Sequence, residues 1–202
     1  VTVGLLRYLN APGVMAAGMK PLASGCERTP DGRLRNEDAL LIRDASALEL
    51  PYELVNPFPF EPPVAPHIAA ARAGVVIDME TILERFNMIA DQADCVIVEG
   101  VGGWEVPVDD DAGMPDLAAA LGLPVILVVG LRLGCINHAL LTAQATRARG
   151  LHLAGWVANR VETSVDEEQA VIEAIANRIG APMLGNIHHN QQEFSRAFSL
   201  QL

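Results

Sequence analysis

The sequence predicts a three-layer α/β fold built on a mainly parallel sheet. Two segments, Cys95–Val98 and Val125–Val129, are apolar at every position. Strands that are apolar on both faces are typical of a parallel sheet covered by helices. Segments of helical periodicity alternate with these strands, and this alternation is the pattern of α/β folds.

The N-terminal part of the chain combines short regular elements with loops. Residues 1–9 cluster their apolar side chains as the body of a helix does, and residues 14–19 follow as a short buried strand. A turn-forming polar loop is expected over 20–25 and an exposed, arginine-rich loop over 26–35. A second helix is expected over residues 36–43.

The next segment, residues 51–66, contains six prolines. Proline lacks an N–H donor and fixes φ, so this density excludes a regular helix or a central strand. We expect an ordered or semi-ordered excursion over the surface.

The second half of the chain carries the clearest elements. Asp78–Gln92 has apolar residues at helical spacing, and the Asp78 carboxylate can cap its first turn. Ser164 and Glu167 have the spacing of a capping box for a helix over 165–179. A further helix is expected over 136–149. Gly150 would end this helix, and Gly180 would end the helix over 165–179. The remaining expected elements are strands over 95–98, 125–129, 153–158 and 183–187.

Composition bounds the class of protein. The 202 residues suit one domain with a real core, because a chain of this size buries about 70% of its surface on folding. No apolar run reaches the ~18 residues that a membrane span needs. The 14 basic and 25 acidic residues give a net charge of −11, which disfavours general binding to phosphate backbones.

The three cysteines, Cys26, Cys95 and Cys135, lie far apart in the sequence. No CxxC pair occurs, so neither a zinc site nor a disulfide framework is indicated. No signal peptide is visible, and a reduced cytoplasmic setting is expected.

Ligands of parallel α/β sheets bind beyond the carboxyl ends of the strands, and this rule selects the candidate site. The residues that follow the expected strands are Lys20, Ser24, Glu99, Gly100, Gly102, Gly103, Gly130, Arg132, Gly134, Cys135, Asn159, Arg160, His188 and His189.

The sharpest local signal is the apolar run 96–98 followed by Glu99 and Gly100. A carboxylate at that place can hold Mg²⁺ on a nucleotide phosphate, as the acid of a Walker-B strand does. The glycines after it allow backbone N–H groups to approach a phosphate. The alternative is a strand-terminating turn with an exposed glutamate.

Lys20, Ser24 and Asp38 each have a functional and a structural interpretation. Lys20 is either a solvated lysine or a point charge for a phosphate or carboxylate, with a further donor from Ser24. Asp38 lies near a helix start, where an acid is often a cap or a surface residue.

Two further segments remain ambiguous on their own. Residues 131–137 lead into a helix N-terminus, which offers N–H groups to an anion but is also an ordinary loop. Cys135 lacks a neighbouring base, so a nucleophilic role is not expected. Adjacent residues such as His188 and His189 seldom ligate one ion, so a polar loop is favoured there.

Several motifs occur together in one order over roughly residues 1–187. They are Gly18–Gly25, Leu34–Ala39, Val55–Pro57, Pro66–His67, Val98–Trp104, Pro124–Ala139 and Gly155–Asn159. As a set they resemble the family of dethiobiotin synthetases, the ATP-dependent carboxylase and cyclo-ligase of biotin synthesis.

The resemblance implies a P-loop-type α/β domain over residues 1–202 that works as a homodimer. It implies 7,8-diaminononanoate, CO₂ and ATP as substrates and Mg²⁺ as the metal. One amine takes up CO₂ to give a carbamate, ATP phosphorylates the carbamate, and the second amine closes a cyclic urea.

Site residues follow from the same resemblance. Lys20 would be catalytic, Ser24 would bind the carbamate, and Asp38 and Glu99 would hold Mg²⁺ on the nucleotide. The other nucleotide-binding residues would be Gly100, Val101, Gly102, Asn159, Arg160, His188, His189 and Asn190. The substrate carboxylate would be received, across the dimer interface, by Leu133, Gly134, Cys135, Ile136 and Asn137.

The sequence also departs from the family pattern. The Gly-rich phosphate loop ending in Gly-Lys-Thr is absent, and the family has it just upstream of the helix that begins here near Val1, so we expect a truncated N-terminus. Two other functions stay open: another P-loop ATPase or amidotransferase-type ligase, and a non-catalytic dimerising module. Strong ATPase activity without the diamine would favour the first of these.

Overall fold

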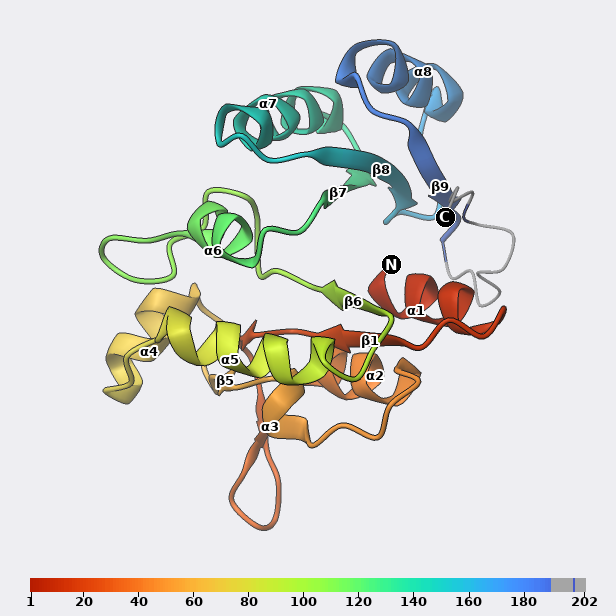
Figure 1. The fold of residues 1–202 in the computed structure, drawn as a ribbon. Coiled ribbons are helices and arrows are strands. Elements are labelled where there is room, and N and C mark those ends of the chain that lie inside the picture. Colours follow the sequence, from red (N-terminus) through yellow and green to blue (C-terminus); the bar gives the residue numbers. More distant parts are fainter. Residues whose placement is uncertain (190–197, 199–202) are drawn as a thin grey trace. The chain divides into compact units, whose positions relative to one another are not determined.

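The computed structural model describes residues 1–189 and Phe198, and the chain divides into two compact units (Figure 1). Thr2–Leu121 form one, called here the N-terminal unit, and the chain from Gly122 onward forms the C-terminal unit. Among the described residues, no helix combines the length and the apolar character needed to cross a membrane. A single domain over residues 1–202 stays a prediction.

A pair of parallel strands forms the centre of the N-terminal unit. β1 (Ala16–Met19) pairs with β6 (Cys95–Val98), and Met19 lies opposite Val98 in the register. Helices α1 (Thr2–Asn10) and α2 (Glu37–Ala45) pack against β1, and α5 (Met79–Ala90) packs against β6. Both strands and all three helices lie close to the ranges that the sequence predicts.

Side-chain caps explain where two of these helices begin. The Asn36 side chain accepts a hydrogen bond from the Ala39 N–H at 3.2 Å and starts α2. Asp78 accepts from the N–H groups of Glu80 and Thr81 and starts α5, as predicted. Each cap satisfies donors that the first helical turn leaves without an internal partner.

The proline-rich segment is more regular than its composition indicates. One helical turn, α3 (Tyr52–Val55), fits between Pro51 and Pro57, and β5 (Phe58–Pro59) follows it. A further helix, α4 (Pro66–Ala73), starts on a proline, which is tolerated because the first helical N–H needs no internal partner. The exclusion of helix was therefore wrong for a single turn and at the end of the segment.

Two loops of the N-terminal unit also contain short strands. β2 (Leu22–Ala23) is buried and pairs in parallel with β5, so the prediction of a turn-forming polar loop over 20–25 was wrong at these two residues. β3 (Glu27–Arg28) and β4 (Leu34–Arg35) form an antiparallel pair in the arginine-rich loop. The short helix α6 (Met114–Leu121) was not predicted.

The C-terminal unit is a three-stranded parallel sheet with two helices. Its order is β7 (Val125–Leu131), β8 (Leu153–Arg160) and β9 (Met183–Ile187). Helices α7 (Cys135–Ala148) and α8 (Glu168–Ile179) lie side by side over the sheet (Figure 1). Their apolar faces and β8 enclose a core in which Trp156 and Ile175 have no exposed surface.

The predicted capping box of α8 was wrong, although Gly180 ends the helix as expected. Glu167 has φ 51°, a left-handed conformation that a helix from residue 165 cannot contain. The helix starts instead at Glu168, whose carboxylate lies 2.5 Å from the Arg160 guanidinium at the end of β8. This ion pair between strand and helix favours the later start.

Gly18 allows α1 and α2 to approach β1 closely. A Cβ at this position would overlap the Ile42 Cγ2 atom of α2 and would lie 2.8 Å from the Leu6 Cδ1 atom of α1. Both neighbours are almost fully buried, so they have little room to move away. The absent side chain is therefore a packing requirement of this unit.

We expect Gly18→Ala to lower the free energy of unfolding by about 1–3 kcal/mol, the usual cost of overpacking a core. Gly103→Ala is the matched control, because nothing lies within 4 Å of a Cβ at that position. Chemical denaturation of both variants checks the prediction. Equal stability of the two variants would contradict it.

Candidate functional site

Strand pairing brings Lys20 and Glu99 to the same edge of the N-terminal unit. Each directly follows one residue of the Met19–Val98 pair, and the Glu99 N–H donates to the Met19 carbonyl at 2.7 Å. The Lys20 ammonium lies 2.7 Å from the Glu99 Oε1 atom and 3.5 Å from the Asp38 Oδ2 atom. The three groups come from the residue after β1, the first turn of α2 and the residue after β6, and the expectation that they meet is confirmed.

The cation at this edge is buried, while its two partners reach solvent. The Lys20 side chain is 8% exposed, compared with 31% for Glu99 and 63% for Asp38. A buried lysine requires compensation of its charge, and the two carboxylates supply it. Their exposed surface leaves oxygen atoms accessible to a ligand.

Glu99 is held in its ionised form. Burial raises its pKa, but the charge and hydrogen bond of Lys20, together with a hydrogen bond from the Thr2 hydroxyl, outweigh burial. The pKa of Glu99 therefore lies below its ordinary value of 4.5. Sequence reasoning missed Thr2, because a threonine in the first turn of a helix gives no sign of its distant partner.

The two carboxylates beside Lys20 suit a cation that takes its other ligands from a nucleotide and from water. Among the residues that the structure describes, no group of three or more histidine, cysteine, aspartate or glutamate side chains is placed to hold a metal. Mg²⁺ is usually bound by one or two carboxylates, with phosphate oxygens and water completing its octahedron. Asp38 and Glu99, which both lie beside Lys20, are the two carboxylates that could hold such an ion.

Ser24 and the loop after β6 lie close to Lys20 and Glu99 in the sequence, and both have features of a binding surface. The Ser24 Oγ atom is buried and has no hydrogen-bond partner in the described part of the chain. A buried hydroxyl of this kind is costly unless a ligand or water satisfies it. Gly102 has φ 70° and its Cβ would lie 2.8 Å from a Val106 methyl, so this turn requires glycine.

The remaining candidates lie in the C-terminal unit, at the carboxyl edge of its sheet. Asn159 lies opposite Gly130 on one side and Ile187 on the other. The segments that follow these strands therefore leave from the same edge. The segments after β7 and β9 contain Arg132, Leu133, Gly134, His188 and His189. Asn159 and Arg160 are the last two residues of β8, and Asn190 lies outside the described residues.

Some of these candidates are already engaged within the unit. The Cys135 side chain lies in the core, and its N–H donates to the Arg132 carbonyl at 3.0 Å. Arg160 pairs with Glu168. By contrast, Leu133 is fully exposed. Gly134 has φ 88° and directly precedes α7, a helix of 14 residues. Ile136 and Asn137 lie in the first turn of this helix. The roles of all these residues stay predictions.

Comparison with known proteins identifies the family. A family model described as an AAA domain matches residues 1–193. The ATP-dependent dethiobiotin synthetase BioD of Aromatoleum aromaticum is 50% identical over 189 residues, covering 94% of this chain and 84% of that protein. The protein of the same name from Pseudomonas aeruginosa strain UCBPP-PA14 is 45% identical, covering 100% of this chain and 89% of that protein.

The chain belongs to the dethiobiotin synthetase family. The resemblance stated from its motifs is confirmed, and with it the assignment to the ligase class of enzymes.

Solved structures confirm the fold class of this dethiobiotin synthetase. The MinD cell division protein of Aquifex aeolicus superposes with a TM-score of 0.52 at 14% identity, covering 96% of this chain and 78% of that one. A ParA family ATPase from Chlorobium tepidum gives a TM-score of 0.50 at 15% identity, covering 96% and 82%. At such identities the likeness shows the P-loop α/β fold and nothing about the reaction.

The lowered pKa of Glu99 makes the stability of this dethiobiotin synthetase depend on pH. A carboxyl whose pKa is lower in the folded state stabilises that state above its ordinary pKa. This contribution is lost as the pH falls below about 4.5 and through the lower folded pKa.

Glu99→Gln removes the titrating group. We expect the variant to be less stable than the wild type by about 1 kcal/mol at neutral pH, and the difference to shrink as the pH falls below 4.5. Urea unfolding of both proteins across this range checks the expectation. A difference that stays constant with pH would contradict it.

Proposed function

We propose that the chain catalyses the ATP-dependent carboxylation and ring closure of 7,8-diaminononanoate to dethiobiotin. The observation that carries the proposal is the buried Lys20 ammonium, 2.7 Å and 3.5 Å from two carboxylates at a strand edge, in a chain half identical to a protein named for this reaction. CO₂ as the carbon source, a homodimer and a cytoplasmic setting belong to the same proposal.

The reaction needs charge stabilisation at two stages. An amine attacks CO₂ and loses a proton to give a carbamate, which is a poor electrophile. Transfer of the ATP γ-phosphoryl group to a carbamate oxygen releases ADP and creates a mixed anhydride. The second amine then attacks the carbonyl carbon, the carbon–oxygen bond to phosphate breaks, and a cyclic urea and inorganic phosphate form. Negative charge thus develops first on the carbamate and then on the transferring phosphoryl group.

Lys20 is suited to stabilise both charges. Its ammonium is a compact point charge on a side chain that is 8% exposed, and electrostatic stabilisation is strongest where water is largely excluded. The neighbouring carboxylates compensate the charge when no substrate is present. Ser24, whose hydroxyl lacks a partner among the described residues, would donate a hydrogen bond to the carbamate.

Asp38 and Glu99 would hold Mg²⁺ together with the nucleotide. When bound, the ion neutralises charge on the transferring phosphoryl group. The two side chains fit this role because they are the acidic groups at the Lys20 edge and both retain exposed surface.

The remaining substrate contacts are those that the family resemblance assigns. Gly100, Val101 and Gly102, with Asn159, Arg160, His188, His189 and Asn190, would bind the nucleotide, and Asn159 would read the adenine edge. The first turn of α7 and the preceding Leu133 and Gly134 would receive the substrate carboxylate, because N–H groups of a helix start attract anions. Because the Cys135 side chain lies in the core, the backbone near Cys135, and not its thiol, would contact the substrate carboxylate.

The other functions left open by the sequence are not favoured. The likeness to MinD and ParA proteins is one of fold, at 14–15% identity. The relatives at 45–50% identity are named as dethiobiotin synthetases. A non-catalytic module has no need to bury its Lys20 charge beside two acids.

Formation of dethiobiotin from the diamine, bicarbonate and ATP tests the proposed function, in protein expressed from the complete natural gene. We expect ADP release to depend on the diamine, and Lys20→Ala to lower turnover by about 10²–10³-fold, as the loss of one preorganised donor does elsewhere. Circular dichroism and melting would show that the variant is folded. Diamine-independent ATP hydrolysis, or full activity of folded Lys20→Ala, would overturn the assignment.

The magnesium dependence of turnover tests the proposed metal site separately. Asp38→Asn should raise the Mg²⁺ concentration needed for half-maximal rate by about tenfold, which corresponds to about 1.4 kcal/mol. Asp44→Asn, an exposed acid on the same helix, is the matched control and should leave that concentration unchanged. Equal Mg²⁺ dependence of the two variants would remove Asp38 from the metal site.

A further inference from the structure

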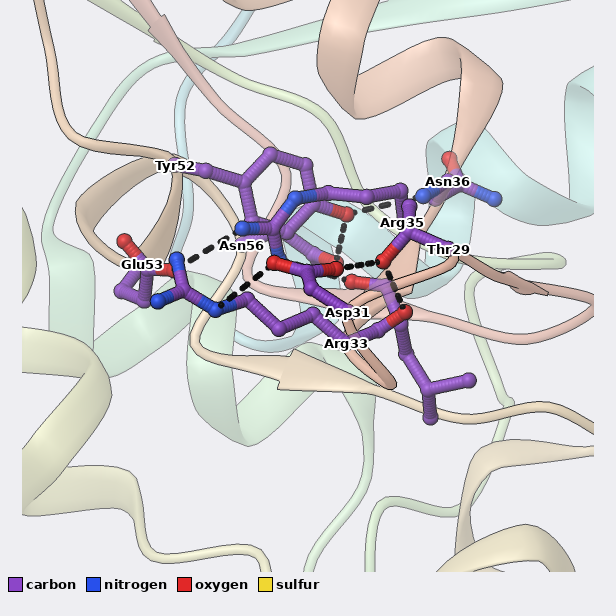
Figure 2. A network of polar contacts seen from close by, with 9 residues as sticks. Thr29, Asp31, Arg33, Arg35, Asn36, Tyr52, Glu53 and Asn56 are labelled. Carbon is purple, nitrogen blue, oxygen red and sulfur yellow. Dashed lines mark hydrogen bonds and ion pairs between the residues drawn. The ribbon is translucent and has the colours of Figure 1, made fainter.

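The motif Val55-Asn56-Pro57 has no role in the proposed reaction, yet Asn56 is 1% exposed. Tyr52, four residues earlier in α3, is 3% exposed. Both side chains carry polar groups, and burial of such groups is tolerated only where each is hydrogen-bonded. Their partners therefore indicate what these residues do (Figure 2).

Val55 and Asn56 hold the backbone of Lys20. The Lys20 N–H donates to the Val55 carbonyl at 2.9 Å, and the Asn56 side-chain amide donates to the Lys20 carbonyl at 2.6 Å. Lys20 lies just beyond the last residue of β1, where the pairing with β6 has ended. The proline-rich segment thus takes over from the sheet in holding this residue.

Tyr52 connects the same amide to the start of α2. Its hydroxyl donates to the Asn56 Oδ1 atom at 2.9 Å and accepts a hydrogen bond from the Asn36 N–H at 2.8 Å. The Asn36 side chain in turn accepts from the Ala39 N–H. Asp38 lies between these two residues, so an unbroken series of hydrogen bonds runs from the Lys20 backbone to the first turn that carries Asp38.

The surroundings of Tyr52 fix its ring. The Arg35 guanidinium stacks over the ring at 4.0 Å from its centre, and an ion pair with Glu53 at 3.1 Å holds the guanidinium (Figure 2). The Asn36 N–H can only donate and the Asn56 Oδ1 atom can only accept, so the two hydrogen bonds of the Tyr52 hydroxyl have one defined direction.

We propose that Tyr52 and Asn56 are positioning residues that set the distance between the Lys20 ammonium and the Asp38 carboxylate. The inference rests on the proposed function, since it concerns the same two side chains. Helix α2 also packs against β1, but the series is what joins the Lys20 backbone by hydrogen bonds to the first turn of α2, where Asp38 lies.

Tyr52→Phe tests the proposal by removing one oxygen atom. The Asn36 N–H and the Asn56 Oδ1 atom then lose their partner in a buried place, while the ring and its contact with Arg35 remain. We expect kcat to fall about tenfold with little change in the KM of the diamine, because a small misplacement of reacting groups acts on the chemical step. The Mg²⁺ concentration for half-maximal rate should rise.

A spectroscopic readout reports on position without turnover. Lys20 is the one lysine in the 202-residue sequence, and the Lys20→Arg variant assigns its signal in lysine-selective ¹⁵N spectra. The Lys20 side-chain nitrogen should shift in Tyr52→Phe. Ile89→Val, a core truncation in α5 of similar cost to stability, is the control and should leave that signal and kcat unchanged.

A double-mutant cycle completes the test. Asn56→Ala should lower kcat at least as much as Tyr52→Phe, and the double variant should be no worse than Asn56→Ala alone, because both changes break one series. Additive losses, or a Tyr52→Phe protein with wild-type kcat and an unshifted Lys20 signal, would overturn the inference. Absence of dethiobiotin formation by the wild type would instead refute the proposed function, and the Lys20 signal would still decide the positioning role.

Discussion

The N-terminal unit is organised around one charge that is removed from water. The Lys20 ammonium is buried, and a buried cation is tolerated only when opposite charges or hydrogen bonds compensate it. Glu99 and Asp38 do so from two other elements, so β1, β6 and α2 must end or begin at one place. The electrostatic requirement of one side chain thus constrains the geometry of three segments that are far apart in the sequence.

Compensation by exposed acids has a functional consequence. A lysine neutralised by fully buried partners would be inert, whereas Glu99 and especially Asp38 keep surface that solvent reaches. A divalent cation can therefore approach these carboxylate oxygens. This arrangement is what an ATP-dependent ligase needs, because the charges that it must stabilise arrive with the substrates.

The proline-rich segment supports this site in a way that its composition conceals. Prolines exclude long regular elements, but they leave Val55 and Asn56 free to bond the Lys20 backbone where the strand stops. A segment rich in prolines also loses less conformational entropy on folding. Such a segment can therefore hold a loop residue at a lower entropic cost. Its hydrogen bonds to Lys20 and within the segment account for the polar side chains that it buries.

Sequence alone determined the fold class, most strands and the identity of the catalytic candidates. Apolar runs such as 95–98 and 125–129 have one stable environment, a covered parallel sheet, and the residue after each strand is then placed at the edge. The meeting of Lys20 and Glu99 was predictable for that reason, whereas Asp38, on a helix, was expected beside them only from the family resemblance. Tertiary structure alone decided the rest: the late start of α8, which follows the Arg160–Glu168 pair, the burial of β2, and the bonds of Thr2, Tyr52 and Asn56. Those features depend on partners distant in the chain, and local pattern carries no information about which distant group a buried hydroxyl or amide will meet.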